Sequence, residues 1–266
     1  MFDPARPSLK SRIAAGDCLA VAWMALGSVT LVEAAVRMRP DAIVIDMQHG
    51  LWERRELESA IGLVPHDIPV IVRVAENSAL AIGTALDAGA EGVMVPMVET
   101  AKDTANAIRY AQYPPHGVRS AGGVRPLRDF GAYLRGASQI AVLVMIETTA
   151  GLTNAKAIAG TRGLDMVFIG TGDLAISLQT DVGDSRKHAR ACASILRACQ
   201  AASLPCGIFT GTPESAAQYS SDGYGMVVVA SDIDVVTRGF ASAGEAFEAA
   251  RPARSPRKRS SPAKAR

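Results

Sequence analysis

The sequence predicts an α/β fold, a single (β/α)₈ TIM barrel followed by a disordered basic tail. Eight short apolar runs recur along the chain, and most are rich in Val and Ile, which is typical of parallel strands buried on both faces. Amphipathic stretches separate most of them, so strands and helices alternate. A chain of 266 residues, 48% hydrophobic and 20% charged, suits one barrel domain. We therefore predict a barrel over residues 1–250 and a tail over residues 251–266.

The apolar runs and the stretches between them define the expected elements in order. The expected strands are Leu19–Met24, Ala42–Ile45, Val70–Val74, Gly92–Pro96, Ala141–Ile146, Met166–Ile169, Cys206–Phe209 and Met226–Val229. The expected helices are Ser28–Arg37, Glu53–Leu63, Ser78–Asp87, Ala101–Ala111, Leu152–Ala159, Arg186–Ala202, Pro213–Ser220 and Ile233–Ala250. One long connection, Gln112–Gln139, interrupts this rhythm. Its length predicts a functional segment, either a lid or a contact with a neighbouring subunit.

Charge and composition exclude several classes of protein. The formal charge is +2, but the tail holds seven of the 28 Lys and Arg residues, which leaves 21 basic against 26 acidic residues elsewhere, a net −5. The tail has little to bury and is expected to be disordered; we interpret it as solubilising rather than as a polyanion-binding arm, so we expect no nucleic-acid partner. No run approaches the ~18 apolar residues of a membrane span, and no apolar signal segment follows Met1.

The cysteines also favour an intracellular protein. None of the four belongs to a CxxC or a Cys/His cluster: they are Cys18, Cys192, Cys199 and Cys206. A zinc site is therefore not expected, and free core thiols suit a reducing compartment. We predict a cytoplasmic location without a membrane partner.

Two carboxylates follow neighbouring strands. Glu147 ends the fifth apolar run, and Asp173 follows the sixth run within a Gly-Thr-Gly-Asp turn. The carboxyl ends of barrel strands form the catalytic face, and oxygen ligands suit a hard divalent cation such as Mg²⁺ or Mn²⁺. The alternative is that each acid only caps the helix that follows it.

A histidine and an arginine are expected at the same face. His49 follows the second strand shortly after Asp46, and Arg73 lies near the end of the third. Enolate chemistry requires this combination, because a metal and an arginine hold negative charge on an oxygen while a base moves a proton.

Each of these residues also has a simpler interpretation. His49 can be a hydrogen-bonded loop residue, Arg73 an ion pair that closes the barrel, and Asp46 a helix cap; Asp46 and Gln48 are supporting candidates. The glycine-rich turn at Gly172 offers backbone amides for a carboxylate or phosphate. The remaining histidines lie away from strand ends and are expected at the surface: His66, His116 and His188.

Six motifs resemble a known family over roughly residues 10–245. They are IDMQHG (45–50), PVIVRV (69–74), LDAGAEGVMVPMVET (86–100), YPPHGVRSAGG (113–123), VMIETTAGLTN (144–154) and FIGTGDLAISLQ (168–179). The chain resembles the class II, metal-dependent pyruvate aldolases of the HpcH/HpaI type, which include 4-hydroxy-2-oxoheptanedioate and 2-dehydro-3-deoxyglucarate aldolases. These enzymes act in the catabolism of aromatic compounds or sugar acids.

The resemblance implies a role for each site residue. His49 is the catalytic base, Arg73 stabilises the enolate oxygen, and Glu147 and Asp173 ligate the metal, which is Mg²⁺, Mn²⁺ or Co²⁺. Backbone amides of Gly172 and Asp173 hold the substrate carboxylate.

A further role falls to Asp87, which tunes the histidine. Asp87 ends the helix before the fourth strand, near the bottom of its own barrel, and so reaches a histidine only on another subunit. The family's homohexamer, a trimer of dimers, supplies that contact.

The implied reaction is a reversible cleavage of 4-hydroxy-2-oxo acids. His49 removes the 4-hydroxyl proton, the C3–C4 bond breaks, and an aldehyde leaves. The metal and Arg73 hold the enolate of pyruvate or hydroxypyruvate until it is protonated.

Three departures from the family pattern leave the substrate open. Met47-Gln48 replaces Gly-Glu, Met145 replaces a glutamine, and Thr171-Gly172 replaces Pro-Ala. The alternatives are a citramalyl- or malyl-CoA lyase on the same fold and a non-catalytic binding protein.

Overall fold

A computed structural model describes residues 7–123, 131, 134, 136–182 and 185–251. The chain divides into two units, Met1–Ile233 and Asp234–Arg266. Apart from residue 251, the predicted basic tail lies outside the described residues, and the assignment of residues 1–250 to one domain stays a prediction. Among the described residues, no helix is both long enough and apolar enough to cross a membrane.

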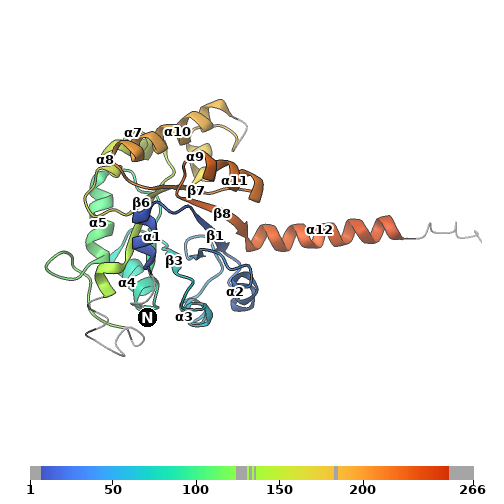
Figure 1. The fold of residues 1–266 in the computed structure, drawn as a ribbon, viewed down its shortest axis with the longest axis horizontal. Coiled ribbons are helices and arrows are strands. Elements are labelled where there is room, and N and C mark those ends of the chain that lie inside the picture. The colour runs from blue at the N-terminus through green and yellow to red at the C-terminus, as the bar shows by residue number, and fades with distance from the viewer. Residues whose placement is uncertain (1–6, 124–130, 132–133, 135, 183–184, 252–266) are drawn as a thin grey trace, which may run out of the picture. The chain divides into compact units, whose positions relative to one another are not determined.

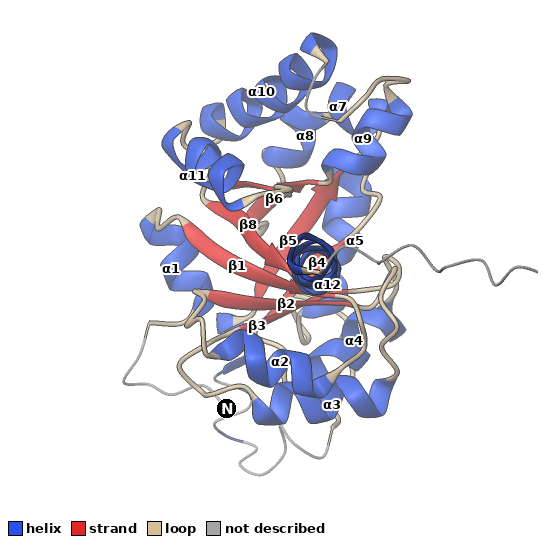
Figure 2. Cartoon of the chain, turned by 90° about the vertical axis from the view of Figure 1, so that its right-hand side faces the viewer, coloured by secondary structure: helices blue, strands red, loops and turns tan. Residues whose placement is uncertain are grey.

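The first unit is a closed barrel of parallel strands, which confirms the predicted fold class. Each strand pairs with its neighbours in sequence, and β8 pairs with β1 to close the sheet. Figure 2 shows these strands enclosed by helices. The strands are β1 (Leu19–Met24), β2 (Ala42–Asp46), β3 (Val70–Arg73), β4 (Gly92–Val95), β5 (Ala141–Ile146), β6 (Met166–Ile169), β7 (Cys206–Ile208) and β8 (Met226–Ser231).

Helices follow the strands in alternation (Figure 1). Several begin at a Ser or Thr whose side chain accepts a backbone N–H of the first turn, such as Ser28, Ser78 and Thr100, because these residues satisfy otherwise unpaired helix amides. The helices are α1 (Leu9–Ala15), α2 (Val29–Val36), α3 (Arg54–Leu63), α4 (Ala79–Asp87), α5 (Ala101–Ala111), the short 3₁₀ helix η2 (Ala137–Gln139), α7 (Thr149–Thr153), α8 (Ala155–Ala159), α9 (Thr171–Ser177), α10 (Arg186–Ala201), α11 (Pro213–Ser221) and α12 (Asp232–Ala250).

The core has two layers because side chains alternate along each strand. Alternate residues of β5 show this: Val142 and Val144 pack outward against the helices, while Leu143 and Met145 pack inside the barrel. Leu9 and Ile13 of α1 join the inner layer. The fold therefore places a packed interior beneath the ends of the strands, and the polar residues lie at those ends.

The elements depart from expectation at two places beside the site. The expected helix Leu152–Ala159 is divided at Asn154, whose side chain donates to the carbonyl of Glu99 at 2.8 Å. The Gly-Thr-Gly-Asp turn is not an open turn: Thr171 already begins α9. The sequence prediction missed this helix because Gly170 at its N-cap and Gly172 in its first turn resemble a loop.

Candidate active site

Asp46 and Arg73 form a buried ion pair at the mouth of the barrel. They are partners in the register between β2 and β3. Arg73 Nε donates to Asp46 Oδ1 at 2.8 Å, and Arg73 Nη2 donates to Asp46 Oδ2 at 2.5 Å. This two-point geometry fixes the guanidinium plane. Arg73 is thus part of an ion pair at the barrel rim, as one interpretation of the sequence held.

Asp46 also shapes the loop that carries His49. Its Oδ1 accepts the backbone N–H of Gln48 at 3.0 Å and that of His49 at 3.2 Å, so it caps this loop and not a helix. Burial raises the pKa of Asp46, but the hydrogen bond and charge of Arg73 and these two amides outweigh burial and lower it. A Cβ on Gly50 would lie 2.1 Å from the carbonyl oxygen of Asp46, so the turn requires glycine.

An aromatic wall, formed by Trp23, Phe168 and Phe209, stands beside this pair. The Trp23 indole lies 5.0 Å from the Arg73 Cζ atom, measured to the ring centroid, and its Nε1 lies 3.4 Å from Asp46 Oδ2. Trp23 stacks on Phe168 and meets Phe209 edge to face. Sequence reasoning missed Trp23, although its position near the end of the first strand was a usable signal.

Glu147 is a buried carboxylate with one free oxygen. Its Oε1 accepts the backbone N–H of Met97 at 2.6 Å, while Oε2 is buried and has no hydrogen-bond partner in the part of the chain that the structure describes. Met97 holds a φ of +56° to present that N–H, a strained conformation of the kind found at functional sites. A Cβ on Gly170 would lie 2.3 Å from Oε2, so the position requires glycine to leave space for this oxygen.

The surroundings of Glu147 disfavour its charged form. Burial raises its pKa; the Met97 amide opposes this, and the charge of Asp173 adds to it. Glu147 does not cap the next helix, since Thr148 fills that position. Asp173 lies half-buried in the first turn of α9, where an acid is favoured in any case.

These two carboxylates fit a divalent cation. A buried oxygen without a partner beside a second carboxylate is the donor set that Mg²⁺ takes from proteins, together with waters and substrate oxygens. No group of three or more His, Cys, Asp or Glu suited to a metal occurs in the described part of the chain. The rim therefore offers a two-carboxylate site and leaves other coordination positions open.

The structure does not bring every predicted residue together. His49 is exposed at the rim, and the buried side-chain oxygen of Gln48 has no hydrogen-bond partner among the described residues. Asp87 ends α4 and is bound by Arg119, whose Nη2 donates to Asp87 Oδ1 at 3.0 Å. Arg119 is buried and stacks on Tyr113, an interaction that the sequence did not reveal.

The barrel and its rim match one protein family. The family model of HpcH/HpaI aldolase/citrate lyase matches residues 19–238. The chain belongs to this family. The resemblance inferred from the sequence is confirmed, and this match covers the whole of the rim just described.

Two relatives and one solved structure agree with the assignment of this chain to the HpcH/HpaI family. It is 37% identical over 244 residues to a hydroxypyruvate/pyruvate aldolase of Paraburkholderia phytofirmans, covering 85% of this chain and 91% of that protein. It is 32% identical to a 4-hydroxy-2-oxovalerate aldolase of Rhodococcus jostii, covering 87% and 92%. A family structure from Burkholderia cenocepacia J2315 superposes with a TM-score of 0.82 at 32% identity, over 90% of this chain and 98% of that one. The chain is thus related to aldolases over most of its length.

One histidine of this family member is not where the sequence placed it. His66 and His116 are exposed, as expected. His188 was predicted at the surface but is only 2% exposed, because it lies on the face of α10 that also buries Ala191 and Cys192. The spacing of three and four residues was the helical signal for that face.

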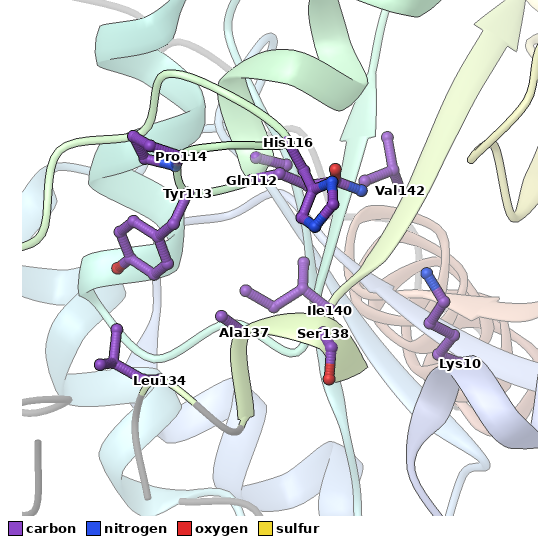
Figure 3. Close-up of a pocket in the computed structure, with 11 residues that line it drawn as sticks. Lys10, Gln112, Tyr113, Pro114, His116, Leu134, Ala137, Ser138, Ile140 and Val142 are labelled. Carbon is purple, nitrogen blue, oxygen red and sulfur yellow. The ribbon is translucent and has the colours of Figure 1, made fainter. Parts of the chain in front are cut away.

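A cavity of about 530 Å³ lies at the other end of β5 from Glu147, beside Ile140 and Val142. Figure 3 shows His116 and Lys10 among the side chains around it. Lys10 is already paired with Asp165 at 3.1 Å, and none of the predicted site residues lines the cavity. The candidate site at the carboxyl ends of the strands is therefore separate from this cavity.

Proposed function

We propose that this protein is a divalent metal-dependent aldolase that cleaves 4-hydroxy-2-oxo acids to an aldehyde and pyruvate or hydroxypyruvate. The observation that carries the proposal is the free, buried Oε2 of Glu147 beside Asp173. A buried carboxylate whose charge is only partly compensated is costly to a protein, and a bound cation such as Mg²⁺, Mn²⁺ or Co²⁺ would remove that cost. The names of the aldolase relatives support the same reaction class.

The residues of the rim divide the chemistry among them. When bound, the cation supplies a Lewis acid for the oxygen on which negative charge develops. His49 accepts the proton of the substrate 4-hydroxyl, and the electrons of that O–H bond form the aldehyde carbonyl as the C3–C4 bond breaks. The electrons of the broken bond pass to the 2-oxo oxygen, and Arg73 stabilises this charge from its place on Asp46. A proton then returns to C3.

The proposal also covers how the site binds the substrate carboxylate and recognises the donor, pyruvate or hydroxypyruvate. We assign the carboxylate to the backbone amides of Gly172 and Asp173. Space around Gly172 supports this, because a Cβ there would meet no atom within 4 Å. Met145 is buried in the inner layer close to Gly170, so the rim next to Glu147 has an apolar side chain where the family resemblance implies an amide. We expect this change to alter polar recognition of the donor.

We also propose that the active assembly is a hexamer, a trimer of dimers, in which Asp87 of one subunit faces His49 of another. Within one chain Asp87 lies at the end of α4 against Arg119, and no hydrogen bond joins it to His49 in the described residues. The Asp87 carboxylate is partly exposed, so a neighbouring subunit can reach it. A carboxylate there orients the imidazole and stabilises its protonated form.

Subunit mixing tests this pairing. We expect H49A and D87N to be inactive separately and to regain part of the aldol cleavage when mixed, because a mixed interface pairs an intact histidine with an intact aspartate. Native mass spectrometry verifies subunit exchange. Verified exchange without recovered activity would show that Asp87 does not serve His49 across subunits.

Metal removal tests the reaction class. We expect a chelator to abolish cleavage of a 4-hydroxy-2-oxo acid, and Mg²⁺, Mn²⁺ or Co²⁺ to restore it. Full activity in excess chelator, or borohydride trapping of the enzyme with pyruvate, would contradict a metal mechanism. Supplying acetyl-CoA in place of pyruvate in the aldol direction separates the CoA-ester lyase alternative, and absence of turnover with every donor and metal would favour a binding protein.

A further inference from the structure

α10 holds both ends of the short helix that carries Asp173. His188 Nε2 lies 3.0 Å from the carbonyl oxygen of Thr171, the first residue of α9. Lys187 Nζ donates to the carbonyl oxygen of Leu178, the residue that caps the other end, at 2.6 Å. Seven residues of helix span only ~10 Å. Two neighbouring side chains of α10 thus fix the two ends of α9.

The start of α9 depends on such tertiary contacts because it lacks a local cap. Gly170 occupies the N-cap position and provides no side-chain hydrogen bond, whereas helices commonly begin at a Ser, Thr, Asp or Asn. The contacts made there include the His188 bond, a bond from Thr171 Oγ1 to the carbonyl of Phe209 at 3.3 Å, and a backbone bond from the Gly170 N–H to the carbonyl of Ile146 at 3.3 Å. Gly170 itself is required by the Glu147 oxygen beside it.

The chemistry of His188 makes it a fixed donor. A carbonyl oxygen only accepts, so Nε2 carries a proton in this contact. Cys192 Sγ lies beside the ring, 4.0 Å from Nδ1 and 3.9 Å from Nε2. Burial raises the pKa of Cys192 to about 11, so the sulfur stays a thiol. His188 and Cys192 therefore do not form a nucleophile–base pair, and the bond to Thr171 is what the imidazole contributes.

We propose that His188 is a positioning residue that fixes the turn Thr171–Asp173 and so holds the Asp173 carboxylate beside Glu147. This inference rests on the proposed cation site. The ring acts from outside the barrel, through one backbone carbonyl two residues before Asp173. Residues that hold ligands in place typically influence metal affinity by about 10- to 100-fold.

Three variants separate the hydrogen bond from the bulk of the ring. H188Q keeps an amide donor at about the reach of Nε2, H188N keeps the amide but falls short, and H188L keeps apolar bulk. We expect Mn²⁺ affinity, measured by calorimetry, to fall about tenfold or more in H188N and H188L and to recover in H188Q. Amide hydrogen exchange of residues 170–176 is expected to accelerate in the same two variants. Equal affinity and exchange in H188N and wild type would overturn the proposal.

A matched control is K187M, which removes the bond at the far end of α9. We expect its Mn²⁺ affinity to match wild type, and an equal loss in K187M would show general loosening of α9 and overturn the assignment to His188. E147Q identifies the cation site: Mn²⁺ binding that E147Q leaves intact would defeat the proposed function, while hydrogen exchange still tests the positioning. If H188L does not fold, the pair H188N and H188Q decides.

Discussion

Replacing Glu147 with glutamine is expected to abolish Mn²⁺ binding and to slow aldol cleavage strongly, while making the metal-free protein more stable. Glutamine keeps the acceptor for the Met97 amide but removes the charge from a side chain that is 1% exposed. We expect kcat to fall roughly 100- to 1,000-fold. We expect Tm of the metal-free protein to rise about 2–4 °C for each kcal/mol gained.

The gain in stability has a defined pH dependence. Burial raises the pKa of Glu147 above its ordinary value of 4.5, so its protonated form supports folding below that value and this support is lost as pH rises through the folded pKa. The difference in Tm between metal-free E147Q and wild type should therefore be small near pH 4.5 and grow above it. An unchanged difference across this range would contradict the buried, uncompensated charge.

Asp165 provides the matched control for Glu147. Burial also raises its pKa, but it accepts from the Val142 amide and pairs with Lys10 near the start of β6, away from the rim. D165N is expected to change stability and to leave Mn²⁺ binding intact. Mn²⁺ binding retained by E147Q, or lost in D165N, would place the cation elsewhere.

Replacing Arg73 with glutamine is expected to damage both turnover and folding. Arg73 holds the charge that develops on the 2-oxo oxygen in the proposed reaction, and its loss should reduce kcat about 100- to 1,000-fold. It also neutralises Asp46, whose side chain is 3% exposed. Leaving that carboxylate unpaired costs about 3–5 kcal/mol of unfolding free energy.

A double variant separates these two effects. In D46N/R73Q the buried charge is gone, so most of the lost stability should return in chemical unfolding, while kcat stays low. R12Q controls for loss of an arginine pair at the other end of the barrel, because Arg12 binds Asp41 just before β2, and it should keep near-normal kcat. Recovery of kcat in D46N/R73Q would show that Arg73 only supports the fold.

Strand periodicity made the barrel and the general place of the site predictable. The bounds of β1, β5 and β6 match expectation, and the apolar runs of β5 and β6 stop directly at Glu147 and Gly170. The carboxyl ends of parallel strands share one rim, so the positions of Glu147 and Asp173 after neighbouring strands were enough to expect them together. The helix α9 was not expected, since its stability comes from contacts with α10 that no local pattern reveals.

The sequence by itself determined the fold class, the family and the rim at which the polar residues meet. Tertiary structure decided how those residues are used. Arg73 pairs with Asp46 because the register of β2 and β3 aligns residues 27 positions apart. Asp87 is held by Arg119, which lies 32 positions further along the chain. His188 is buried because one face of α10 packs inward. Long-range strand register and helix packing select these partners, and the local pattern of apolar and polar residues along the chain specifies neither.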